Sequence, residues 1–61
     1  MDTKENYLAM IERVRNESSI EGLRKLEESS ERLYNNYCLK GFEFRHIDIL
    51  IMEKMISMEA A

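Results

Sequence analysis

The sequence predicts an all-α protein, built either as a short three-helix unit or as a helical hairpin with a bent first arm. Charged residues make up 34% of the 61 residues, and there are two glycines and no proline, which is a helix-forming composition. Apolar residues recur at helical spacing near residues 3–16, 19–35 and 42–58, and no segment alternates with the period of a strand. A chain this short predicts a single helical domain over residues 1–61.

The first helix is expected at residues 3–16. Asp2 or Thr3 is placed to cap its start, because short oxygen-bearing side chains accept hydrogen bonds from the first free amides of a helix. One apolar stripe at helical spacing should face the core, and it consists of Tyr7, Met10 or Ile11, and Val14.

The second helix should begin near Ser18. Ser18 and Glu21 have the spacing of a capping box, in which each side chain satisfies the backbone amide of the other residue. This pattern predicts that the first helix ends and a second one begins near residues 16–18. The alternative is one long helix with a weak point at the serines.

The second helix carries a seam of residues spaced by three and four: Leu23, Leu26, Ser30, Leu33 and Tyr37. Asn35 and Asn36 should end it, because asparagine tolerates the left-handed conformation that follows many helices. The short turn to Gly41 makes the next helix an antiparallel neighbour, with Tyr37 and Leu39 packing back onto the core.

The third helix, near residues 42–58, has no good N-cap and is apolar on two sides. Successive residues turn by about 100°, which separates its apolar residues into two nearly opposite stripes. The stripe expected to face the core contains Phe44, Ile47, Ile51, Met55 and Met58. The other contains Phe42, Ile49, Met52 and Ile56, with Arg45 among them. A separate polar face is formed by Glu43, His46, Glu53, Lys54 and Ser57.

A helix that is apolar on two sides needs cover on both sides, and two short helices supply little of it. The second stripe therefore predicts self-association, most simply as a homodimer with a two-fold axis. The alternative is a monomeric bundle in which Ile20, Tyr37, Leu39 and the first helix cover this stripe.

Few residues offer site chemistry. Cys38 and His46 are the only cysteine and histidine, so neither an internal disulfide nor a four-ligand zinc site is expected. Glu43 with His46 would make at most part of a weak metal site. Cys38 is interpreted as a small buried apolar residue, with a reactive thiol or an intersubunit disulfide as the alternative. No catalytic motif is present, so we expect no enzyme and no cofactor.

Charge and hydropathy restrict the partners. The net charge is −3 and no segment is basic, which argues against nucleic acid as a partner. A DNA-associated transcriptional regulator stays as the alternative, because Arg13, Arg15, Arg24 and Lys25 cluster loosely around the expected break. No apolar run is long enough to span a membrane, and a single cysteine without an export signal favours the cytoplasm.

The sequence therefore predicts a non-catalytic protein-protein interaction module. Its expected partners are a second copy of itself, as a homodimer or higher oligomer, and a further protein that the sequence does not name. In size and composition the chain resembles short acidic helical accessory proteins of bacteria and bacteriophages, a likeness that carries no motif and implies a regulatory or inhibitory role.

Overall fold

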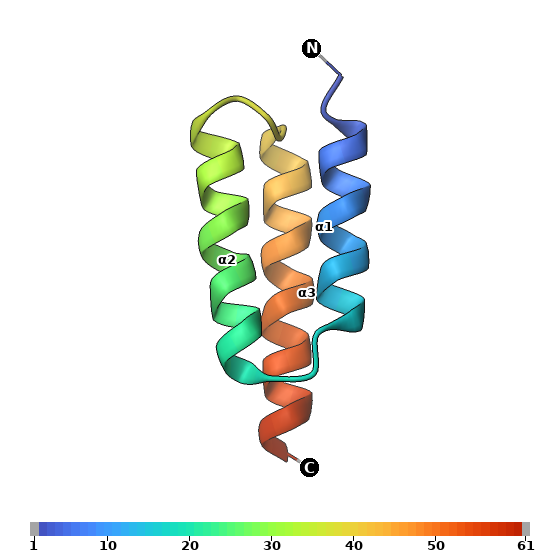
Figure 1. Ribbon diagram of the computed structural model, residues 1–61, viewed down its shortest axis with the longest axis vertical. Helices are drawn as coiled ribbons and strands as arrows, with labels where there is room; N and C mark the ends of the chain where they lie inside the picture. The colour runs from blue at the N-terminus through green and yellow to red at the C-terminus, as the bar shows by residue number, and fades with distance from the viewer. Residues whose placement is uncertain (1, 61) are drawn as a thin grey trace.

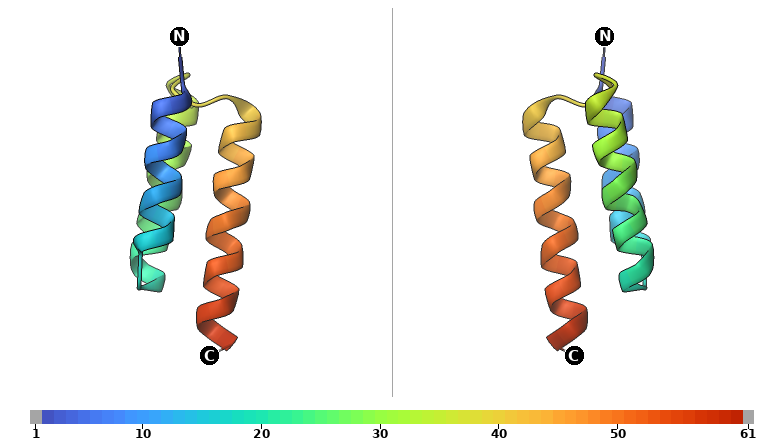
Figure 2. Two further views of the ribbon diagram at one scale, coloured as in Figure 1. Left: turned by 90° about the vertical axis from the view of Figure 1, so that its right-hand side faces the viewer. Right: turned by 90° about the vertical axis from the view of Figure 1, so that its left-hand side faces the viewer.

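Three helices make up the fold in the computed structural model, which describes residues 2–60 (Figure 1). They are α1 (Lys4–Asn16), α2 (Ile20–Asn35) and α3 (Gly41–Ala60), so the prediction of an all-α three-helix unit is confirmed. Each helix runs antiparallel to the next, which makes α1 and α3 parallel. Figure 2 shows α1 and α2 in one layer, with α3 running alongside them in a second layer. The last turns of α3 extend beyond the α1–α2 connection (Figure 1).

The predicted break between α1 and α2 is present, but its cap lies one residue later than expected. Ser19 is the N-cap of α2, and its hydroxyl accepts a hydrogen bond from the amide of Gly22 at 3.0 Å. The carboxylate that completes this turn belongs to Glu17, which accepts from the amides of Ser18 and Ser19 at 3.1 and 3.2 Å. A Cβ on Gly22 would lie 2.1 Å from the Glu17 carboxyl carbon, so the glycine leaves room for this arrangement. The expected capping box of Ser18 with Glu21 is therefore wrong.

The turn after α2 is a Schellman motif, a common way to end a helix. The amide of Cys38 donates to the Leu33 carbonyl at 2.8 Å, and the amide of Tyr37 donates to the Tyr34 carbonyl at 3.0 Å. The left-handed residue is Tyr37, with φ 61°, and not an asparagine; Asn36 has φ −97°. The expectation that Tyr37 packs onto the core is also wrong, because its side chain is 85% exposed.

The start of α3 is capped by Glu43, which the sequence had placed on the separate polar face of this helix. Its carboxylate is buried and accepts a hydrogen bond from the amide of Lys40 at 2.8 Å. Glu43, at the third helical position, thus caps the helix start in place of an N-cap side chain. The same oxygen accepts from the Thr3 hydroxyl at 2.5 Å. Thr3 is the N-cap residue of α1 but makes no side-chain cap to its own helix, while Asp2 accepts from the amide of Lys4 at 3.0 Å.

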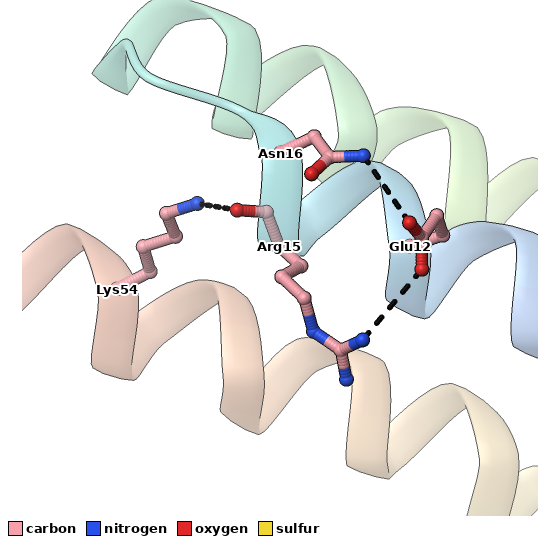
Figure 3. A network of polar contacts seen from close by, with 4 residues as sticks. All are labelled: Glu12, Arg15, Asn16 and Lys54. Atoms are coloured by element: carbon pink, nitrogen blue, oxygen red, sulfur yellow. Dashed lines mark hydrogen bonds and ion pairs between the residues drawn. The ribbon is translucent and has the colours of Figure 1, made fainter.

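Lys54, also assigned to the polar face, joins the C-terminal part of α3 to α1. Its side chain is half-buried, and its ammonium donates to the carbonyl of Val14 at 2.7 Å. It also donates to the carbonyl of Arg15 at 2.5 Å (Figure 3). These carbonyls belong to the last turn of α1, where a cation is favoured by the helix dipole. Arg15 and Glu12 form an exposed ion pair beside it, with N and O 3.6 Å apart (Figure 3).

The core lies between the three helices. Five of the ten residues that the sequence assigned to it are buried: Val14, Leu23, Leu26, Ile47 and Ile51. The other five are half-buried against them: Tyr7, Ile11, Leu33, Phe44 and Met55. Met10 and Leu39 complete the buried set, and Ser30 is buried at the small position of the α2 seam. Met10 is 2% exposed, so the alternative between Met10 and Ile11 is decided in favour of the methionine.

Candidate self-association surface

An apolar seam runs along the side of α3 that faces away from α1 and α2. We call Phe42, Arg45, Ile49, Met52 and Ile56 the outer seam; they follow one another at intervals of three, four, three and four residues. This is the spacing of the contact line in a coiled coil. The four apolar members were predicted to mediate self-association, and their side chains are 67%, 47%, 51% and 64% exposed in chain order.

The fold explains why the outer seam stays open. Ile47 and Ile51 are 0% exposed, which means that α3 turns its opposite stripe toward α1 and α2. Two helices packed against one stripe of a third cannot also reach the far side of it. No helix within residues 2–60 packs over the outer seam, whose four apolar side chains stay 47–67% exposed, so the alternative of a bundle that buries both stripes does not hold for this part of the chain. Leu39 is buried in the core and Ile20 is half-buried, and neither brings the seam residues below 47% exposure.

Charged residues flank the outer seam unevenly. Arg45 and His46 lie in the N-terminal half of α3, and Glu53 and Glu59 lie in its C-terminal half, all of them exposed. Within residues 2–60 the one ion pair closer than 4.0 Å joins Arg15 to Glu12, so these four side chains have no charged partner there. The C-terminal half of the seam therefore carries two acidic side chains, whereas the N-terminal half carries Arg45, with the half-buried Asp48 three residues further on.

His46 takes part in a contact between helices. Its Nδ1 is hydrogen-bonded to the hydroxyl of Tyr7 on α1, and the two rings lie 5.8 Å apart. Glu43 is bound to Thr3 and Lys40, and no hydrogen bond within residues 2–60 links its carboxylate to His46.

A shallow groove opens beside the N-terminal half of the outer seam. Its volume is about 460 Å³, and it is lined by Tyr34, Gly41, Phe42, Phe44, Arg45 and Asp48. The rings of Tyr34 and Phe44 form its stacked aromatic wall, with centroids 4.6 Å apart and planes inclined by 9°. Sequence reasoning missed this groove, because it requires the end of α2 to lie against α3. The position of Arg45, in contrast, follows from the spacing of the seam.

The residues considered for other chemistry are not brought together. The Cys38 thiol is free, half-buried and within 3.5 Å of the Asn36 carbonyl. Among residues 2–60, no three histidine, cysteine or acidic side chains lie close enough to hold a metal ion.

The basic residues of the DNA-binding alternative lie toward one end of the bundle. Arg13 and Arg15 are in the last turn of α1, and Arg24 and Lys25 are in the first half of α2, all exposed. These segments are at the end of the bundle where α1 passes into α2 (Figure 1). Arg15 forms an ion pair with Glu12, which reduces the positive charge at this end of the bundle.

Comparisons with known proteins add no relative: no protein-family model, no curated protein and no solved structure matches the chain. No helix in residues 2–60 is both long and apolar enough to cross a membrane. The surface of the molecule is therefore the basis for a proposal about its function.

Proposed function

We propose that this chain is a non-catalytic protein-protein interaction module that self-associates through the outer seam of α3, forming a homodimeric helical bundle. The observation that carries the proposal is the exposure of all four apolar seam residues along one line of a well-formed helix. Contiguous exposed apolar surface of this kind marks interaction sites in small proteins. A regulatory or inhibitory accessory role in the cytoplasm, of bacterial or phage type, is the setting that we propose for it.

The free energy available at the seam is sufficient for a reversible dimer. Fully burying a large apolar side chain contributes about 1.5–3 kcal/mol. The seam side chains are already about half covered, and two copies contribute eight of them, so the gross gain is about 6–12 kcal/mol. Association costs at least about 4 kcal/mol in lost translational and rotational freedom. The upper end of this range leaves about 8 kcal/mol after that cost, which corresponds to a dissociation constant of about 1 μM, so we expect a dimer in the micromolar range.

The test is the mass of the protein in solution. Sedimentation equilibrium at high micromolar concentration should give about twice the 7.3 kDa of one chain, falling toward one chain on dilution. Ile49→Glu and Met52→Glu should each give a folded monomer, because a charge at the centre of the seam has no partner there. Leu8→Glu is the matched control, since Leu8 is 52% exposed on α1, outside the seam, and Met52 is 51% exposed within it.

Two results would contradict the proposal. One is a wild-type mass of a single chain at high micromolar concentration. The other is an equal effect of Leu8→Glu and Met52→Glu on the mass, which would show that self-association does not depend specifically on the outer seam.

The accessory role is tested by affinity capture from the native cell with wild-type and Met52→Glu protein. A regulatory or inhibitory module should recover a specific protein whose yield depends on the surface that it uses. The DNA-associated alternative predicts retention on DNA at low salt, a steep decrease in binding with added salt, and loss on replacing Arg13, Arg15 and Arg24. Absence of retention at low salt would remove that alternative.

A further inference from the structure

We infer that the partner on the outer seam is a second copy held antiparallel, so that Arg45 of each α3 lies against the acidic half of the other. This inference rests on the proposed self-association and adds its orientation, its charge contacts and the use of the aromatic groove. It follows from the uneven distribution of charge along the seam.

Parallel pairing would place like charges together. With both α3 helices running in the same direction, Arg45 lies in the contact line opposite Arg45 of the partner subunit, and the two Glu59 side chains also meet. Like charges opposite one another destabilise a pair, and burying them in a seam increases the cost. None of these side chains has a charged partner within residues 2–60 that would offset the repulsion.

Antiparallel pairing reverses this relation. In antiparallel coiled coils the two kinds of seam position face each other, which places Ile49 against the partner's Met52 on either side of the two-fold axis. Arg45 then lies opposite the partner's Ile56, within one helical turn of the partner's Glu53 and the partner's Glu59. Two-fold symmetry creates this contact twice, and it also places His46 near the partner's Glu53.

The aromatic groove completes the contact. Arg45 and Phe42 belong both to the outer seam and to the lining of the 460 Å³ groove. In the antiparallel arrangement the partner's Ile56 reaches this edge, where the Arg45 stem and the Phe42 ring give it apolar surface. The last turns of α3 project beyond the α1–α2 connection (Figure 1). In the antiparallel dimer these turns lie over the groove of the second copy.

The first test is a charge reversal measured by sedimentation equilibrium. Arg45→Glu should raise the dissociation constant about tenfold or more, because it turns two favourable contacts into two repulsive ones. Glu53→Lys with Glu59→Lys should do the same. Combining all three substitutions in one chain should restore the wild-type constant to within about threefold. In a parallel dimer Arg45→Glu leaves like charges opposed, as before, and the dissociation constant would stay near that of the wild type.

The second test is a distance between spin labels. In a Cys38→Ser background, Ala60→Cys places one label at the end of each α3. A rise of 1.5 Å per residue puts two antiparallel labels about 30 Å apart, and parallel helices put them about 10 Å apart.

The outcomes separate the two proposals. Monomeric wild-type protein removes both. A dimer that dissociates with Met52→Glu but shows the short label distance, or no recovery in the triple variant, keeps the self-association and overturns the antiparallel arrangement. A dimer with the long distance and full recovery supports both.

Discussion

The two sides of α3 have similar side chains and opposite environments. Ile47 and Ile51 are 0% exposed, whereas Ile49, between them in sequence, is 47% exposed and Met52, which follows Ile51, is 51% exposed. Side-chain chemistry does not separate the two sides, because both consist of large apolar residues. The difference arises from the two helices that pack on the inner side, and it shows that helix packing in this chain uses only half of the apolar surface that α3 provides.

Truncating an inner residue should have the largest effect. Ile51→Ala should destabilise the fold by about 2–5 kcal/mol, because it leaves a cavity between packed helices. Ile56→Ala removes a similar side chain from the outer seam, where water fills the space, and should cost under about 1 kcal/mol at a concentration that keeps the protein monomeric. Urea unfolding followed by circular dichroism measures both. Equal losses in the two variants would show that the outer seam is packed within one chain.

Removing the polar contact at the inner side of α3 should have an intermediate effect. Lys54→Met keeps the length of the side chain but removes the hydrogen bonds to the carbonyls of Val14 and Arg15, so we expect a loss of about 1–2 kcal/mol. Lys25→Met on the exposed side of α2 is the matched control and should change stability by under about 0.5 kcal/mol. The same urea titration compares them, and a control variant as unstable as Lys54→Met would refute the bridging role.

The smallest effect concerns acid. The hydrogen bond from Thr3, together with the Lys40 amide and charge, lowers the pKa of Glu43 below its ordinary value of 4.5 despite the opposing cost of burial. A lowered pKa in the folded state means that the ionised form stabilises the fold above pH 4.5, and this contribution is lost as the pH falls through the folded-state pKa.

Thermal unfolding between pH 7 and pH 3 should therefore show a decrease in stability that begins near the ordinary pKa of a glutamate. Glu43→Gln should lower stability at pH 7 and flatten this decrease. Glu31→Gln, at an exposed position of α2 outside the seam, should leave the profile unchanged. A profile unaltered by Glu43→Gln would show that this carboxylate does not couple folding to acid.

The sequence was sufficient to predict what depends on neighbouring residues. Helical spacing predicted the three helices and the separation of α3 into two stripes, and the serines predicted the break after α1. Two adjacent serines are nearly equivalent as caps, which is why the predicted cap was off by one residue.

What the sequence could not provide were contacts between distant residues. Glu43 and Lys54 look like solvent-facing residues because their partners, Thr3 and Val14, are each 40 positions away in the chain. Tyr37 was misplaced for another reason. The left-handed position at a helix end usually holds glycine or asparagine, so the sequence pointed to Asn35 or Asn36 for it, and not to Tyr37.

The equal separation of those two contacts has a consequence for how the chain can change. Thr3, the N-cap residue of α1, and Val14 are eleven residues apart, and their partners Glu43 and Lys54 are eleven residues apart on α3, so the two parallel helices stay in register between these contacts. Deleting or inserting one residue between the contacts in only one helix would shift an end by about 1.5 Å and rotate it by about 100°. An insertion or deletion between the two contacts should therefore occur in both helices together, or else lie outside this interval. A homologue that shortens α1 between the contacts should shorten α3 by the same number of residues.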